Sequence, residues 1–78
     1  IRGVEVALMI FQQDDTNCRI NFRSKGEIIV NDIAKKLGGG GHAFAAGAII
    51  NEALEKATEK AVSLTKASIN NQLNQHII

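Results

Sequence analysis

The chain has 78 residues, a formal net charge of +1 and an apolar content of 45%, so it forms at most one small domain. The near-zero net charge excludes bulk polyanion binding. Because Cys18 is the only cysteine, no internal disulfide can form, which suits a reducing compartment. No apolar run approaches the roughly 20 residues of a membrane span, and no signal peptide is visible. We therefore expect a cytoplasmic protein without membrane contacts and, since the chain starts at Ile1, an excised part of a longer one or a processed product.

The first 24 residues predict a β-hairpin. Residues 3–13 are rich in β-branched and apolar side chains, which predicts a strand with one face fully buried and the other mostly buried. Residues 14–17 have the composition of a turn. Residues 18–24 alternate between apolar and polar side chains, which indicates a second strand with one polar face. That face carries Arg19, Asn21 and Arg23.

A short helix is predicted after the hairpin. Asn31 is a good N-cap, and Ile33 and Leu37 lie four residues apart on one helix face. Gly38 is suited to end the helix. The two apolar positions are about one turn apart, so we expect a helix of about two turns.

The C-terminal part predicts a short strand at residues 48–50 and a longer helix. Asn51 can cap this helix, which would start near Glu52, and Glu52 can pair with Lys56. A mostly apolar stripe follows at helical spacing: Leu54, Ala57, Ala61, Leu64 and Ser68. Beyond Ser68 the chain is rich in Asn and Gln, so we expect residues 69–78 to form a polar, frayed tail.

Together these elements predict an α+β domain over residues 1–68. We expect a small mixed β-sheet with an N-terminal hairpin, packed against a short helix and a longer C-terminal helix.

Four consecutive glycines, residues 38–41, precede His42 and a segment of small residues. Ordering four glycines is costly, so a flexible connector is the simplest interpretation. The alternative is an anion site, because glycines in front of a short helix leave backbone N–H groups free for a phosphate. The P-loop and dinucleotide motifs do not fit: no Gly-Lys-Ser/Thr follows, and a helix precedes the run where a strand is required.

Other chemistries have little support in the sequence. His42 can donate a hydrogen bond to a phosphate oxygen at physiological pH. Cys18, His42 and His76 lack the spacing of a zinc site, and no serine has the context of an activated nucleophile. Cys18 is typical of a small core residue, and His76 receives no role. The basic excess between Arg19 and Lys36 is typical of a solvated face.

The segment 38–47 resembles the GGGHxxAAG signature of the DHH-associated (DHHA-type) C-terminal domain of DHH-family phosphoesterases. Residues 3–7, 21–26 and 29–34 also resemble this family in order and spacing, so the resemblance covers about residues 1–65. The DHH motif itself and its clusters of metal-binding Asp residues are missing from this sequence.

The resemblance implies the substrate-binding part of a larger hydrolase. A DHH domain N-terminal to this one would hold two metal ions, usually Mn²⁺, that activate water, whereas this domain would bind no metal and hydrolyse nothing alone. Arg23 would clamp a phosphate with its planar fork, and a homodimer is possible. The implied substrate-binding residues are Arg23, Gly38, Gly39, Gly40, Gly41, His42, Ala45, Ala46 and Gly47.

Several branches of the family share this pattern. The sequence is most similar to the nanoRNase type, an oligoribonuclease that also dephosphorylates 3'-phosphoadenosine 5'-phosphate, so short oligonucleotides or nucleotide bisphosphates are the expected partners. RecJ-type exonucleases and cyclic-dinucleotide phosphodiesterases are alternatives, whereas alanyl-tRNA synthetases lack a histidine at the place of His42. A non-catalytic RNA-binding or dimerisation module is an alternative of another class. It is disfavoured by the scarcity of aromatic platforms for base stacking.

Overall fold

Four strands form one antiparallel sheet in the computed structural model, which describes residues 5–77. The strand order is β1-β2-β4-β3, and every neighbouring pair is antiparallel. The α+β class is confirmed, but the expected mixed sheet is wrong. Residues 3 and 4 of the predicted first strand lie outside the described residues. In chain order the elements are β1 (Val6–Asp14), β2 (Asn17–Ser24), α1 (Asn31–Lys36), β3 (Gly40–His42), β4 (Ala45–Ile50) and α2 (Leu54–Ile77).

The β1–β2 hairpin turns where the sequence predicted it. The Asp14 carboxylate accepts hydrogen bonds from the Thr16 backbone N–H at 2.9 Å and from the Asn17 side-chain amide at 3.0 Å. The turn is therefore fixed by local side-chain chemistry, as in an Asx-turn. A register shift between Gln12 and Asp14 accompanies it.

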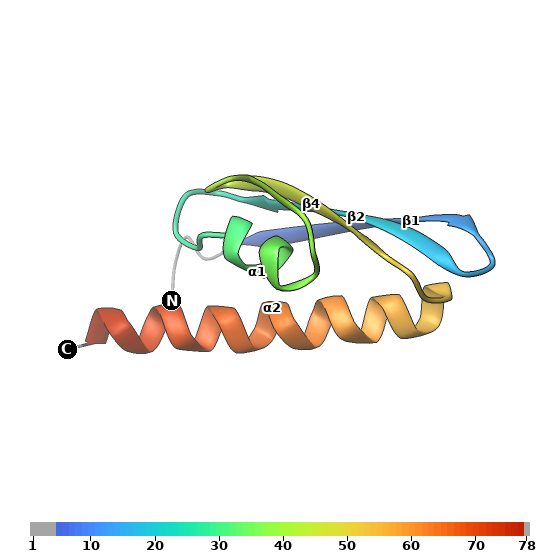
Figure 1. Cartoon of the computed structure of the whole chain (residues 1–78). Helices are drawn as coiled ribbons and strands as arrows, with labels where there is room; N and C mark the ends of the chain where they lie inside the picture. The colour runs from blue at the N-terminus through green and yellow to red at the C-terminus, as the bar shows by residue number, and fades with distance from the viewer. Residues whose placement is uncertain (1–4, 78) are drawn as a thin grey trace.

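Both helices lie on the same face of the sheet (Figure 1). On that face, β2 and β4 contribute fully or almost fully buried side chains, which pack with residues of α1, of α2 and of the segment before α1. The buried apolar residues are Cys18, Ile20, Phe22, Ile28, Val30, Ile33, Ala34, Ala48, Ile50, Ala57 and Ala61. Cys18 is confirmed as a core residue.

The opposite face of the sheet, here called the open face, carries no helix among the described residues (Figure 1). Residues that pair directly across antiparallel strands point to the same face. The register therefore places on the open face the residues Ala7, Met9, Phe11, Arg19, Asn21, Arg23, Gly40, His42, Ala45, Gly47 and Ile49. The expectation that the second face of β1 is mostly buried is wrong, because Ala7, Met9 and Phe11 are exposed.

Helix α1 begins one residue earlier than predicted. Val30, not Asn31, is the N-cap, and it has no side-chain cap hydrogen bond. The fully buried Val30 is held in place by its backbone N–H, which donates to the Ala43 carbonyl at 2.7 Å. Asn31 becomes the first helical residue, and its buried side-chain oxygen has no hydrogen-bond partner. Core packing at Val30 thus overrides the capping preference of Asn31.

Helix α2 differs from prediction at both ends. It starts at Leu54, beyond Asn51, and Glu52 forms an ion pair with Lys60 at 2.7 Å, where we expected Lys56. It also continues to Ile77, whereas we expected fraying beyond Ser68. Among the described residues, no helix is both long and apolar enough to cross a membrane.

A side-chain amide fastens the distal part of α2. Gln72 accepts a hydrogen bond from the Ile29 N–H at 2.8 Å and donates one to the Ile29 carbonyl at 2.9 Å. Ile69 and Leu73, on the same part of the helix, are partly buried against the core. This non-local contact explains why a segment rich in Asn and Gln remains helical.

Gln72→Ala is expected to destabilise the domain by about 1 kcal/mol, since it removes the two hydrogen bonds to Ile29 and the one to the Ser68 hydroxyl, and leaves the Ile29 N–H without this partner. Amide hydrogen exchange should accelerate at Ile29 and in the last turns of α2. Asn71→Ala, at the neighbouring exposed position, is the matched control and should change neither. Equal exchange rates in the two variants would contradict a fastening role for Gln72.

Candidate functional site

The glycine run forms an edge strand rather than a loop in front of a helix. Gly38 has a φ of 86° and follows α1, with its N–H bonded to the Lys35 carbonyl at 3.0 Å. Residues 40–42 then form β3, which pairs with β4. The expected short helix after His42 is therefore wrong, because this segment is a β-hairpin. An anion site at a helix N-terminus is excluded here.

Close approach of two backbones explains one of these glycines. A Cβ atom on Gly39 would clash with the Gly47 carbonyl oxygen and lie 2.7 Å from the Ala48 Cα. Both are backbone atoms, which cannot move aside without displacing β4. The Gly39 N–H also donates to the Ala34 carbonyl at 2.7 Å. Gly39 thus allows α1 and the β3–β4 hairpin to meet.

The turn between β3 and β4 is held by bonds from outside the hairpin. Ala43 and Phe44 connect the paired residues His42 and Ala45. Two-residue hairpins usually need positive φ angles, but no described non-glycine residue has one. Instead, the Ala43 and Phe44 carbonyls accept hydrogen bonds from backbone N–H groups of the β2–α1 region. These contacts fix His42 relative to the end of β2.

An open groove of about 740 Å³ runs along the sheet beside the glycine segment. Its size lies within the usual range of small-ligand sites, about 300–1,000 Å³. It contains every predicted substrate-binding residue except His42. The lining residues are Arg19, Asn21, Arg23, Gly38, Gly39, Gly40, Gly41, Ala45, Ala46, Gly47, Ala48 and Ile49.

Arg23 and His42 stand in one cross-strand row of the open face. Arg23 pairs with Ala45, and Ala45 pairs with His42. The Arg23 and His42 backbones are therefore about 10 Å apart, which is two strand spacings. Both side chains are long enough to approach one anion placed over Ala45, although His42 lies beside the groove and does not line it.

The next row has a nearly flat floor. Asn21 pairs with Gly47, and Gly47 pairs with Gly40. The space where a Gly40 Cβ would lie is open, with no heavy atom within 4 Å. A ligand can thus approach the sheet backbone closely at this row, and the Asn21 amide offers both a donor and an acceptor.

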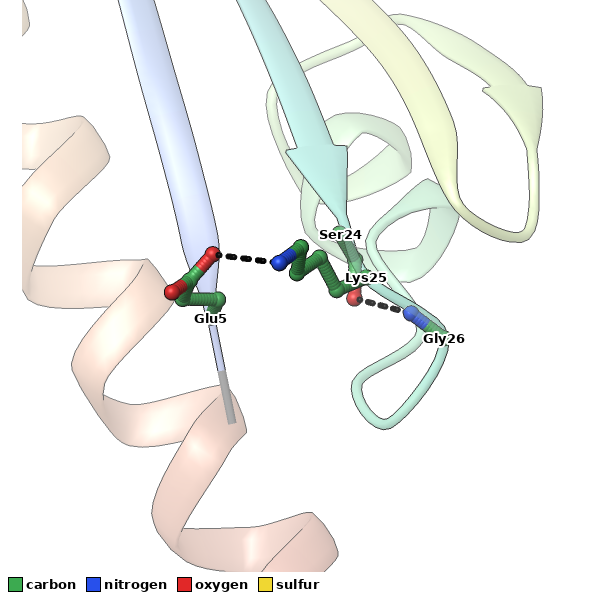
Figure 2. Close-up of polar contacts among 4 residues, drawn as sticks. All are labelled: Glu5, Ser24, Lys25 and Gly26. Carbon is green, nitrogen blue, oxygen red and sulfur yellow. Dashed lines mark hydrogen bonds and ion pairs between the residues drawn. The ribbon is translucent and has the colours of Figure 1, made fainter. Parts of the chain in front are cut away.

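Hydrogen bonds after β2 fix the chain next to Arg23. The Ser24 hydroxyl accepts hydrogen bonds from the backbone N–H groups of Gly26 and Ile28, both at 3.3 Å. Figure 2 shows the bond to Gly26 and the ion pair between Lys25 and Glu5, at 3.6 Å. Because this ion pair is exposed, it contributes little. The hydrogen bonds from the Gly26 and Ile28 backbone to the Ser24 hydroxyl are the contacts that orient the end of β2.

No acidic group supplies acid–base chemistry in the groove. The two described carboxyl groups with displaced pKa values lie elsewhere: the Thr16 backbone N–H lowers the pKa of Asp14, and the Lys60 hydrogen bond lowers that of Glu52. The described residues also contain no group of three His, Cys, Asp or Glu side chains that could hold a metal ion. They therefore do not fit the two-metal centre that the family resemblance implies.

Three groove residues that could contact a ligand were not among the residues predicted from the sequence. Arg19 and Asn21 belong to the alternating polar face of β2, and Ile49 pairs directly with Arg19. The alternation in residues 18–24 is the signal that could have identified the first two. The position of Ile49 depends on the pairing of β2 with β4, which no local pattern reveals.

The described residues thus form an α+β domain with an open groove beside a glycine-rich edge strand. The chain belongs to the DHHA1 domain family, which matches residues 1–71. It is also similar to the bifunctional oligoribonuclease and PAP phosphatase NrnA of Bacillus subtilis (strain 168), with 48% identity over 50 residues. That match covers 64% of this chain but 15% of the relative, so the chain spans a small part of the protein it resembles.

Proposed function

We propose that this domain binds the substrate of a DHH-family phosphoesterase, with short oligoribonucleotides and 3'-phosphoadenosine 5'-phosphate as its ligands. Arg23 and His42 would hold a phosphate from the two sides of Ala45. The next row, formed by Asn21, Gly47 and Gly40 and here called the glycine row, would carry the rest of the nucleotide. Hydrolysis would take place on a DHH domain of the same protein. Two Mn²⁺ ions there would activate the attacking water.

The arrangement of Arg23, Ala45 and His42 carries this proposal. Arginine binds a phosphate through two parallel hydrogen bonds, which are stronger than neutral ones. The small Ala45 side chain between Arg23 and His42 leaves room for the phosphate. The similarity to NrnA, whose name states an oligoribonuclease and a PAP phosphatase activity, supports these two ligand classes over others in the family.

Titration of the isotope-labelled chain with the dinucleotide pApA and with 3'-phosphoadenosine 5'-phosphate tests the proposal. Amide chemical shifts should change at Asn21, Arg23, Gly40 and Gly47, and Arg23→Ala should abolish these changes. A second groove, lined by Lys36, Lys56 and Lys60 among others, provides an internal control and should not respond.

The alternative of a general RNA-binding module has a different signature. It predicts shifts spread along α2, binding that strengthens with RNA length, and a steep dependence on salt concentration. Shifts at the lysine-lined groove that exceed those at the open face would also contradict the proposal.

A further inference from the structure

The open face has a third row, which carries two apolar side chains. It lies beyond the row of Arg23 and His42 and the row of Gly47 and Gly40. Phe11 pairs with Arg19, and Arg19 pairs with Ile49. The two apolar side chains are strongly exposed, at 51% for Phe11 and 54% for Ile49. Met9, on the neighbouring row next to Asn21, is 39% exposed. An apolar surface thus adjoins the glycine row on the side away from His42.

This row is continuous with the groove, because Arg19 and Ile49 line the groove and Phe11 lies next to Arg19. Along the groove, the paired positions of the open face contain Arg19, Arg23 and His42 and no carboxylate, whereas the pair of Asp14 and Asn17 lies at the hairpin turn. Its charge therefore complements a phosphodiester chain. An exposed aromatic ring beside an arginine is also the combination with which proteins bind single-stranded nucleic acids, by base stacking and by electrostatic attraction.

Arg19 and Arg23 mark two ends of the groove that lie far apart along β2. Arg19 and Arg23 are four residues apart on β2, which corresponds to about 13 Å along the strand. A phosphate bound between Arg23 and His42 thus leaves Phe11 two rows away, on the far side of the flat row formed by Gly40 and Gly47. A second nucleotide that follows the groove would extend in this direction.

We propose that the row of Phe11, Arg19 and Ile49 forms a platform for the base of the second nucleotide. The Phe11 ring stacks on this base, and Arg19 lies between the two apolar side chains. The inference rests on the proposed function, because it requires the substrate phosphate to occupy the row of Arg23. It identifies oligonucleotides of two or more residues as the ligands that use the whole face. A nucleotide bisphosphate uses only the end near Arg23.

The experiment compares kcat/KM for pApA and for 3'-phosphoadenosine 5'-phosphate in the full-length protein. Phe11→Ala should lower kcat/KM for pApA by about tenfold, the scale of losing one base–aromatic stack, and leave the bisphosphate within about twofold. A dinucleotide with an abasic second residue should be insensitive to the substitution. Phe11→Tyr, which keeps the aromatic face, should retain the wild-type preference.

Phe44→Ala is the matched control. Phe44 is exposed to a similar extent, at 44%, but lies in the β3–β4 turn, next to the row of Arg23 and away from the row of Phe11. It should change neither substrate selectively. Circular dichroism establishes that each variant is folded, as expected for exposed positions.

Three outcomes would overturn the platform. Phe11→Ala could leave both substrates unchanged, or it could weaken both equally, as expected if the apolar row packs against another domain. Phe44→Ala could also reproduce the selective loss. Arg23→Ala separates these results from the proposed function: if it lowers kcat/KM for both substrates, the phosphate site stands and only the platform fails. If it changes neither, the proposed function fails as well.

Discussion

Gly39→Ala is expected to destabilise the domain by about 3 kcal/mol, at the upper end of typical overpacking, whereas Gly40→Ala leaves its stability within about 0.5 kcal/mol. The two glycines are adjacent but meet different surroundings. A Cβ on Gly39 would collide with backbone atoms of β4, and a Cβ on Gly40 would meet no heavy atom within 4 Å. Gly40 is also not among the glycines with positive φ.

Urea denaturation of the two variants measures this difference. A loss of about 3 kcal/mol is a large share of the stability of so small a domain, so Gly39→Ala should be partly unfolded at physiological temperature. Gly40→Ala should instead fold normally and weaken ligand binding, because its methyl group would project from the open face into the groove. Equal stability of the two variants would show that the close approach at Gly39 is not required.

These adjacent glycines illustrate what local sequence can and cannot predict. The Asp14 turn and the end of α1 at Gly38 follow from chemistry within a few residues of each site, and both were predicted correctly. The conformation of residues 39–42 depends on contacts with Gly47 and Ala48 in another strand. Without that pairing, four glycines before a histidine are equally compatible with a flexible connector and with an anion site at a helix, and neither interpretation predicts the hairpin.

The candidate site shows the same division. The resemblance to the DHHA-type signature marked residues 38–47, and the alternation in β2 marked one polar face. Their assembly into one groove required the β2–β4 register, which places Arg23 beside Ala45 and Gly47 beside Asn21. The exposed face of β1 was also missed, because an apolar strand sequence does not reveal whether a second layer covers it. Phe11 and Met9 are available to a ligand because no helix of the described residues covers this face.

Arg23→Ala is expected to lower kcat/KM of the full-length protein by a factor that corresponds to about 2–4 kcal/mol of lost transition-state stabilisation. This is the scale of losing one donor to a transition-state oxyanion. Arg23→Lys should recover only part of this loss, since an ammonium group lacks the planar fork that binds two phosphate oxygens. Lys25→Ala is the matched control. Lys25 is a neighbouring exposed cation whose ion pair is with Glu5, outside the groove, and its removal should leave kcat/KM unchanged.

His42→Ala should produce a loss of the same scale, and a double-mutant cycle tests whether both side chains hold one phosphate. If they share it, the combined loss differs from the sum of the single losses by about 0.5–3 kcal/mol. The pair of Arg23→Ala with Lys25→Ala should be additive within about 0.5 kcal/mol. Additivity of Arg23→Ala with His42→Ala would mean that the two residues act on different groups, and that His42, which lies beside the groove, contacts another part of the substrate.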